Sequence, residues 1–395
     1  MRVRRSTPVV AAVAVLGGLL TVPATALAAP DQEMPFTCAE QWTGSTRATH
    51  SPSSLALDFN RPSDLGKLVL ASATGTVVRV EDAGSRSYGR WITVDHGSGY
   101  ATLYAHLKAQ WVVPGQFVDR GTPIGRVGAT GNVSGAHLHY EQKLGRSVIR
   151  AVFGQGAFPY GATVASANCP DVPLAGDWNG DGRDEVGTFR RGPGTATFSM
   201  QAGDSATVVR LGNPTDWPLA GDWDGDGTTD TGIRRAGIPL FVLRKADGSR
   251  TRVRYGLLKD RPVVGDWDGN GVADVGVWRP GRARFRLRRP DGTSQVIRLG
   301  SAGSQPVTGD WDGNGTTDVG VFDASRATFT LRSAVPGSAP AVSTISTGST
   351  TDLPVTGDWN GDGVTDVGTW NPVTATFSLR LREGRVRTVS FGLPR

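Results

Sequence analysis

A five-fold repeat fills the second half of this 395-residue chain. The tripeptide Gly-Asp-Trp recurs with its aspartate at positions 177, 222, 266, 310 and 358, so successive copies lie 45, 44, 44 and 48 residues apart. Each copy contains short alternating segments, such as Phe285 and Leu287, whose side chains fall on one face of a strand. Four short strands in 44–48 residues match one propeller blade. Residues 171–395 are therefore predicted to form a five-bladed β-propeller, with an open array of β-repeats as the alternative.

The composition agrees with a fold of short strands and tight turns. The chain has 54 Gly and 24 Pro, which work against helix interiors and exclude a coiled coil or a large helical bundle. Hydrophobic residues make up 38% of the chain, too many for a disordered protein. Residues 36–160 also contain strand-like runs, such as Gly75-Thr-Val-Val-Arg-Val, between glycine-containing turns. We therefore expect a mainly β protein with two differently built halves.

Each repeat carries an acidic loop with oxygen-bearing side chains at positions 1, 3, 5 and 9 and glycine at positions 4 and 6. Ca²⁺ prefers six to eight oxygen ligands, and a glycine at position 6 permits the turn that gathers them. Asp-Gly and Asn-Gly turns are the alternative explanation, but turns do not require acids at both position 1 and position 9. The loops resemble the calcium loops of integrin-α FG-GAP (VCBS-like) repeats, which implies up to five structural Ca²⁺ ions. The expected ligands are Asp177, Asn179, Asp181, Glu185, Asp222, Asp224, Asp226, Asp230, Asp266, Asp268, Asn270, Asp274, Asp310, Asp312, Asn314, Asp318, Asp358, Asn360, Asp362 and Asp366.

All five histidines of the chain lie between residues 50 and 139. His137 and His139 are two residues apart in a segment that alternates like a strand, so both imidazoles can reach one site. His50 lies upstream with Asp58 eight residues later, and His106 follows Leu103-Tyr-Ala. Imidazole and carboxylate groups are the ligands that zinc favours, so this part of the chain is a candidate zinc site.

These motifs resemble the M23 (LytM/lysostaphin-like) zinc metallopeptidases, which cut peptides of bacterial cell-wall peptidoglycan. The resemblance rests on His50…Asp58, on Tyr104-Ala-His-Leu107 and on Gly135-Ala-His-Leu-His139, in that order. It implies an antiparallel β-sheet peptidase domain in which His50, Asp58 and His139 bind one Zn²⁺ and His106 and His137 are catalytic. His137 would take a proton from water as general base, and His106 would orient His137 or donate to the oxyanion.

The domain limits follow from signals along the chain. Arg2, Arg4 and Arg5 precede an apolar run and a small-residue cleavage site at 26–28, so residues 1–28 are expected to be a signal peptide. We expect the peptidase domain at 29–155, a linker at 156–170 and the repeats at 171–395. Cys38 and Cys169 are expected to form a disulfide in an oxidising compartment, two free thiols being the alternative.

The leading functional hypothesis is a secreted zinc metalloendopeptidase that hydrolyses peptide bonds of peptidoglycan, with a calcium-stabilised propeller for targeting or substrate binding. Two alternatives remain open: a catalytically silent binding or activator protein, and an adhesion or lectin-type wall-binding protein. Removal of residues 1–28, which contain three Arg and no acid, would lower the formal net charge from +6 to +3. Bound metal ions would raise that charge again, which suits an anionic wall polymer as partner. We expect an extracellular or wall-associated monomer with no nucleic-acid partner and no membrane span in the mature chain.

Overall fold

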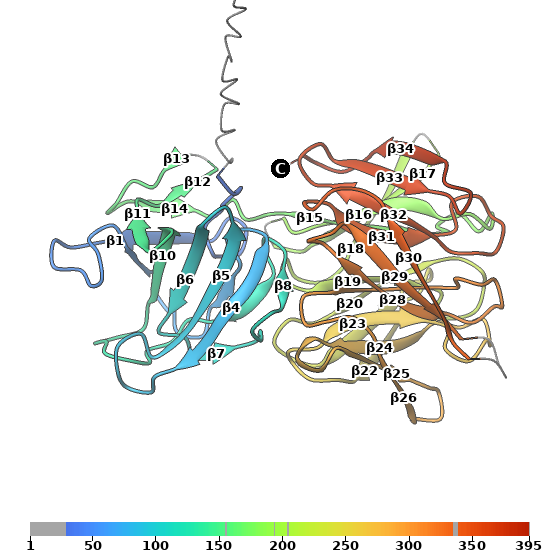
Figure 1. The fold of residues 1–395 in the computed structure, drawn as a ribbon, viewed down its shortest axis with the longest axis horizontal. Helices are drawn as coiled ribbons and strands as arrows, with labels where there is room; N and C mark the ends of the chain where they lie inside the picture. The colour runs from blue at the N-terminus through green and yellow to red at the C-terminus, as the bar shows by residue number, and fades with distance from the viewer. Residues whose placement is uncertain (1–28, 155, 193, 204, 335–338, 395) are drawn as a thin grey trace, which may run out of the picture.

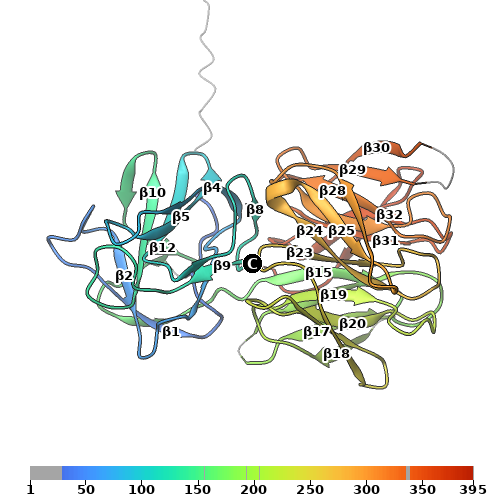
Figure 2. The ribbon, with the colours of Figure 1, turned by 90° about the horizontal axis from the view of Figure 1, so that it is seen from below.

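The computed structural model describes residues 29–394, apart from residues 155, 193, 204 and 335–338. The expected signal peptide at 1–28 lies outside the described residues. The described chain is mainly β, as predicted, and its one helical element is a 3₁₀ turn, η1 (Pro280–Arg282). Figures 1 and 2 show two groups of sheets side by side, one from each half of the chain. Within the described residues, no helix has the length and apolar character needed to cross a membrane.

A nine-stranded antiparallel sheet dominates the N-terminal half, in the order β14-β1-β2-β10-β6-β5-β4-β8 with β11 paired to β10. A three-stranded sheet, β3-β9-β7, and the pair β12-β13 lie beside it. The strands are β1 (Gln41–Ser45), β2 (Leu57–Asn60), β3 (Leu68–Leu70), β4 (Gly75–Asp82), β5 (Arg90–Gly97), β6 (Tyr100–Ala105), β7 (Ala109–Gln110), β8 (Phe117–Val118), β9 (Pro123–Arg126), β10 (Leu138–Leu144), β11 (Ser147–Ile149), β12 (Val152–Phe153), β13 (Gly156–Ala157) and β14 (Thr163–Ala165).

Alternation along these strands buries one apolar face. Phe59, Tyr104 and Tyr140, from the neighbouring strands β2, β6 and β10, are fully buried in one cluster. Residues of opposite orientation on the same strands are free to build a polar site on the other face. The register decides which ones meet, because His139 pairs with Asp58 on one side and with Ala105 on the other.

The segment expected to be a linker differs from that expectation. Strand β14 pairs with β1, with Val164 opposite Trp42, so the segment extends the N-terminal sheet. Asn168 donates from Nδ2 to the carbonyl oxygens of Met34 and Ala71, at 3.1 and 3.2 Å. The structure joins Cys38 to Cys169 in a disulfide with a Cα–Cα distance of 5.0 Å. The chain is therefore tied to the N-terminal half almost until the repeats begin.

The repeats form five separate four-stranded antiparallel sheets. The first strand of each sheet contacts the first strand of the next, and β15 contacts both β19 and β31, so the contacts run round a ring. A cavity of about 410 Å³ is lined by the first strands of all five sheets. The strands are β15 (Asp171–Gly176), β16 (Glu185–Arg190), β17 (Thr197–Ala202), β18 (Ser205–Arg210); β19 (Trp217–Gly221), β20 (Asp230–Arg234), β21 (Leu240–Arg244), β22 (Arg250–Arg254); β23 (Arg261–Gly265), β24 (Asp274–Arg279), β25 (Arg284–Arg288), β26 (Ser294–Arg298); β27 (Gln305–Gly309), β28 (Asp318–Asp323), β29 (Thr328–Ser333), β30 (Ala341–Ser346); and β31 (Leu353–Gly357), β32 (Asp366–Asn371), β33 (Thr376–Arg380), β34 (Val386–Ser390).

Tryptophans of the acidic loops pack between these sheets. Trp267 is buried in one cluster with Phe285 and Leu287 of its own sheet and Val319 of the next. Its indole Nε1 donates to the carbonyl oxygen of Val275 at 3.4 Å. Trp223, Trp311 and Trp359 are buried in the same manner, so these rings fill the core instead of facing solvent.

The two halves of the chain are in direct contact. The buried guanidinium of Arg261 donates to the carbonyl oxygen of Phe117. The Phe117 ring packs against the buried cluster that contains Phe322 and Phe329. Lys259 Nζ also lies 3.4 Å from the carbonyl oxygen of Val112. These contacts place the strand β8 region of the N-terminal half against the ring of five sheets (Figure 2).

Candidate active site

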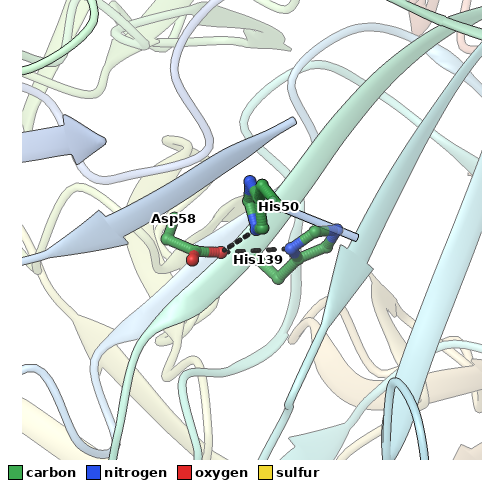
Figure 3. A group of neighbouring side chains, drawn as sticks. All are labelled: His50, Asp58 and His139. Atoms are coloured by element: carbon green, nitrogen blue, oxygen red, sulfur yellow. Dashed lines mark hydrogen bonds and ion pairs between the residues drawn. The ribbon is translucent and has the colours of Figure 1, made fainter. Parts of the chain in front are cut away.

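His50, Asp58 and His139 converge on one point at the end of the nine-stranded sheet (Figure 3). His50 Nε2 lies 3.0 Å and His139 Nδ1 lies 3.1 Å from the same atom, Asp58 Oδ1. One ligand atom from each of these three residues lies within 4.8 Å of the others. The His50 and His139 side chains are each 3% exposed and Asp58 is 15% exposed, so water has little access to the groups.

Neighbouring strands create this convergence. Asp58 of β2 stands directly opposite His139 of β10, and both side chains leave the apolar face. His50 lies in the loop before β2, where its backbone N–H donates to the carbonyl oxygen of Arg47 at 2.9 Å. The three residues that the sequence predicts as zinc ligands are therefore brought together.

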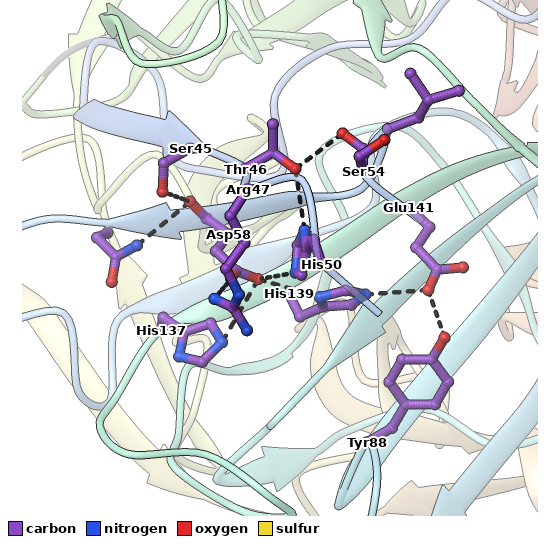
Figure 4. Close-up of polar contacts among 12 residues, drawn as sticks. Ser45, Thr46, Arg47, His50, Ser54, Asp58, Tyr88, His137, His139 and Glu141 are labelled. Atoms are coloured by element: carbon purple, nitrogen blue, oxygen red, sulfur yellow. Dashed lines mark hydrogen bonds and ion pairs between the residues drawn. The ribbon is translucent and has the colours of Figure 1, made fainter. Parts of the chain in front are cut away.

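Hydrogen bonds behind the imidazoles determine which ring nitrogens face the centre. Thr46 Oγ1 donates to the carbonyl oxygen of Ser54 at 2.8 Å, so at 3.2 Å it accepts from His50 Nδ1. Glu141 Oε1 accepts from His139 Nε2 at 3.0 Å. The lone pairs of His50 Nε2 and His139 Nδ1 therefore point at a carboxylate oxygen of Asp58. Figure 4 draws these contacts as dashed lines.

Three acceptor atoms this close require a cation or a proton between them. Burial alone would raise the pKa of Asp58, but hydrogen bonds with His139 and His50 hold it well below its usual range. Burial alone would lower the pKa of His139, but Asp58 and Glu141 raise it above its usual value. In the metal-free protein a proton would have to lie between these atoms. Two imidazole nitrogens and one carboxylate oxygen are also a set of ligands that Zn²⁺ favours, so the ion could take the place of that proton.

His137 and His106 lie beside this centre, on the open groove. His137 Nε2 is 3.6 Å from Asp58 Oδ1, and the His106 and His137 rings are 4.8 Å apart between centroids. His137 Nδ1 donates to the carbonyl oxygen of Gly135 at 3.1 Å, and His106 Nδ1 donates to that of Thr130 at 2.8 Å. Because Nδ1 of each ring donates to a carbonyl, Nε2 is the ring atom that can accept a proton from the groove.

The position of His106 restricts what it can do. Its backbone has a φ of 63°, in the left-handed region, which turns the chain sharply at the end of β6. Burial lowers the pKa of His106 to about 4, with further lowering by His137 and His139. At neutral pH the ring is therefore uncharged and its Nε2 is an acceptor.

The groove itself has a volume of about 710 Å³. Besides the four histidines and Asp58, its walls come from Arg47, Tyr88 and the 132–134 segment. The Arg47 side chain is 68% exposed, and its guanidinium lies 3.8 Å from Asp58 Oδ2. The groove is open enough to admit an extended peptide next to the histidines.

Comparison with known proteins identifies this part of the chain. Residues 54–150 match the model of Peptidase family M23. These residues form an M23 peptidase family domain. The match contains Asp58, His106, His137 and His139, whereas His50 lies just before it.

Several curated proteins resemble the M23 domain. Peptidoglycan DD-endopeptidase ShyA of Vibrio cholerae serotype O1 is 42% identical over 85 residues, which are 21% of this chain and 19% of that protein. DD-carboxypeptidase/endopeptidase Mpg of Neisseria meningitidis serogroup B is 38% identical over 96 residues, 24% of this chain and 21% of that protein. The chain therefore spans about a fifth of the length of the curated relatives it matches.

Solved structures also resemble this chain. A putative peptidase M23 from Pseudomonas aeruginosa is 30% identical, with a TM-score of 0.28, and the alignment covers 33% of this chain and 54% of that chain. The M23 metalloprotease pseudoalterin is 19% identical with a TM-score of 0.29, over 47% of this chain and 99% of that chain.

Two further residues of the M23 domain, Glu141 and Tyr88, support the ligand His139 and are not predicted from the sequence. Glu141 is fully buried and its carboxylate contacts His139, Tyr88 and Lys143, with Tyr88 Oη 2.5 Å from Oε1 and Lys143 Nζ 2.9 Å from Oε2. Burial alone would raise the pKa of Glu141, but these three partners lower it to about 2. Strand alternation from His137 through His139 to residue 141 is the signal that could have identified Glu141. Tyr88 has no such signal, because it comes from a distant loop.

His96, the fifth histidine, lies away from the site and has a structural role. Its Nδ1 donates to the carbonyl oxygen of Thr74 at 2.9 Å, and its Nε2 lies 2.8 Å from Thr102 Oγ1. Burial lowers the pKa of His96. The ring therefore joins β5 to β6 and to the turn before β4.

The acidic loops of the repeats have one geometry. In each loop the first aspartate accepts backbone N–H groups from the residues three and five positions later; Asp310 Oδ1 accepts from Gly313 at 2.8 Å and Oδ2 from Gly315 at 2.7 Å. Carboxylates of Asp222, Asp224 and Asp230 lie within 4.8 Å of one another, as do those of Asp310, Asp312 and Asp318. Among the described residues, the acids of the other three loops are not gathered this closely.

The carboxyl group of the last acid in each loop has a raised pKa. Burial and neighbouring carboxylates raise the pKa of Asp230, Asp274, Asp318 and Asp366 to about 6. Glu185, which occupies this position in the first loop, also has a raised pKa and instead accepts from Asn179 Nδ2 at 2.7 Å. The turn explanation accounts for the first aspartate, but not for the clustering of the later acids.

Proposed function

We propose that this chain is an exported zinc metalloendopeptidase that hydrolyses peptide bonds of bacterial peptidoglycan. One observation carries the proposal: the lone pairs of His50 Nε2 and His139 Nδ1 converge on Asp58 Oδ1, at 3.0 and 3.1 Å, beside two further histidines on an open groove. A peptidoglycan substrate is supported by the names of the relatives ShyA and Mpg.

A zinc ion held by His50, Asp58 and His139 would polarise the scissile carbonyl and make a nearby water more acidic. His137 is suited to accept that proton, because its Nδ1–H is engaged by Gly135 and its Nε2 lone pair faces the groove. The neutral His106 presents a second acceptor and would orient the attacking water through Nε2. Orienting His137 directly would require a proton on one of the two Nε2 atoms, because two acceptors cannot share a hydrogen bond. Donation from His106 to an oxyanion would need a charged ring, which its lowered pKa opposes at neutral pH.

The repeats are proposed to be a five-bladed β-propeller over residues 171–395, following a peptidase domain that starts at residue 29. The ring of contacts among first strands, including β15 with β31, favours closure over an open array. Ca²⁺ is proposed for the acidic loops, as a structural ion. Support comes from Asp312 and Asp318: among the residues that the structure describes, the two buried carboxylate oxygens of Asp312 and Oδ2 of Asp318 have no hydrogen-bond partner.

The two alternative functions make different demands on the site. A catalytically silent binding or activator protein would need no complete set of histidines, and a lectin-type adhesin would need no zinc. The presence of all five polar groups around one groove favours the enzyme over both.

The direct test is digestion of purified peptidoglycan by the full chain with zinc and after chelation, followed by mass spectrometry of the soluble muropeptides. The expected result is a zinc-dependent set of fragments that differ by one hydrolysed peptide bond. Binding to the wall without any new fragment, in the zinc-loaded protein, would contradict the proposal and favour the silent alternative.

A further inference from the structure

Four arginines gather on the third sheet of the repeats. Arg284 and Arg286 alternate along β25 with the buried residues Phe285 and Leu287, so their side chains share the opposite face. Arg298 of β26 stands directly opposite Arg284. Arg282 lies in the turn before β25. We call Arg282, Arg284, Arg286 and Arg298 the arginine cluster.

Within the described part of the chain, no carboxylate forms an ion pair with the arginine cluster, whereas the adjacent Arg279 is paired with Asp260 at 2.8 Å. Arg284 Nε is buried and has no hydrogen-bond partner. Partial burial and the surrounding guanidinium groups of Arg282, Arg279, Arg286 and Arg298 lower the pKa of Arg284. Like charges held this close are unfavourable in the free protein, and an anionic ligand would relieve the repulsion.

The fold does not require these arginines. The fourth sheet has Thr328 and Thr330 at the positions of Arg284 and Arg286, flanking Phe329 in the same way. The fifth sheet has Thr376 and Ser378 there. The Arg284 and Arg286 pair is present in one of the five equivalent sheets, so it points to a ligand of that sheet and not to folding.

Positive charge continues onto the second sheet. Arg250, Arg252 and Arg254 are exposed on β22, on one face by alternation. The two sheets meet where Tyr255 Oη lies 2.8 Å from Ser294 Oγ. Strands β22, β25 and β26 lie at the lower edge of the repeats in Figure 1.

We propose that the arginine cluster binds a linear wall polymer that carries a phosphodiester in each repeat unit. Guanidinium groups bind phosphate oxygens in pairs, and residues i and i+2 of a strand are about 6.6–6.8 Å apart, which allows successive charges to be held. Single-stranded nucleic acid is disfavoured because it needs exposed aromatic platforms, and Phe285 and Trp278 are fully buried here. The choice of a wall polymer, but not the anion site itself, rests on the proposed function.

The test uses the full chain and poly(glycerol phosphate), with dextran as the uncharged polymer, in a titration repeated at several salt concentrations. Arg284→Thr/Arg286→Thr copies the fourth sheet and is expected to bind poly(glycerol phosphate) at least about tenfold more weakly, with a shallower salt dependence. The matched control, Arg210→Thr/Arg387→Thr, removes the same charge from two exposed positions on other sheets and is expected to stay within about twofold. Unchanged melting temperatures show that both variants fold. If Arg284→Thr/Arg286→Thr does not fold, it is replaced by Arg298→Ser, which copies Ser346 of the fourth sheet.

Equal losses in the control variant would overturn the proposal, because only diffuse charge would then matter. Equally tight binding of duplex DNA through Arg284 and Arg286 would overturn the choice of polymer. Cleavage of a soluble stem peptide is measured in parallel and is expected to be unchanged in Arg284→Thr/Arg286→Thr. A wild-type chain that binds the polymer but cleaves no peptide would refute the proposed function and leave the anion site standing.

Discussion

His139 lies between two carboxylates, with Nδ1 3.1 Å from Asp58 Oδ1 and Nε2 3.0 Å from Glu141 Oε1. Because a carboxylate accepts at Nε2, the ring proton is held on the side away from the centre. The lone pair on Nδ1 is thereby directed at the position where a metal ion would sit. Glu141 acts on the site through His139 and is a positioning residue, not one that touches the substrate.

Substitution of Glu141 should weaken zinc binding. In Glu141→Ala the imidazole of His139 loses its partner and can adopt the other tautomer, so zinc affinity is expected to fall about 10–100-fold. Competition with a fluorescent chelator measures that affinity without any substrate. Glu141→Gln keeps an oxygen acceptor, and it should bind zinc more tightly than Glu141→Ala. Equal zinc affinity in Glu141→Ala and the wild type would show that Glu141 does not orient the ligand.

The two histidines of the His137-Leu-His139 segment should separate binding from catalysis. His137→Ala is expected to retain one zinc per chain and to lose roughly 10²–10⁴-fold in hydrolysis, since it removes a proton acceptor outside the ligand set. His139→Ala should lose both zinc and hydrolysis. Zinc content by elemental analysis and cleavage of a stem peptide give the two readouts. Full wall lysis by His137→Ala would show that the catalytic role is misassigned.

Substitution of Asp312 tests for calcium, because its effect on the melting temperature of the repeats should reverse when calcium is added. Its two oxygens are buried without hydrogen-bond partners close to Asp310 and Asp318. Without calcium, Asp312→Asn relieves repulsion and is expected to raise the melting temperature of the repeats by about 2 °C. With excess calcium the same variant lacks a ligand charge and should melt below the wild type.

Asp291→Asn is the control, because this exposed turn residue makes the same charge change away from the loops. Its effect should be the same with calcium and with chelator. A wild-type melting curve that excess chelator leaves unchanged would argue against calcium in the repeats.

Acid should destabilise the M23 domain partly through His96. Burial places the pKa of His96 in the folded protein below its usual value, so above about pH 6.5 the ring is neutral in both states. As the pH falls below that value, the unfolded chain takes up a proton that the folded chain resists, and stability is lost. His96→Gln should therefore lose less stability than the wild type between pH 8 and pH 5. Urea unfolding at fixed zinc concentration measures the difference, and parallel losses would rule out a contribution from His96.

Much of the active site could be predicted because strand alternation is a local property of sequence. His137 and His139 share a face for that reason, and Asp58 was the one acid in its window. The pairing of Asp58 with His139 depends on β2 lying between β1 and β10, which no local pattern reveals. Tyr88 was missed for the same reason, since it reaches Glu141 from a loop 53 residues away in sequence.

The repeats show the same division between local and long-range information. Their period predicted five four-stranded sheets, and the structure has five. The small residues and prolines of the segment at 156–170 predict a linker, whereas in the structure the backbone of Thr163–Ala165 forms the edge strand of a sheet. The contact between Arg261 and Phe117 could not be foreseen, because neither residue belongs to a repeated motif.

The packing of Phe117 among the buried residues around Phe322 and Phe329 bears on which peptide bonds the proposed enzyme would reach. Two modules on a flexible tether sample a volume set by the length of the tether, and cutting would then be scattered around each attachment point. Here the β8 region contacts the repeats directly, so the groove lies at a constant distance from the arginine cluster. In the proposed enzyme, the peptide bond to be cut would therefore lie at a constant distance from the phosphate group that the arginine cluster holds.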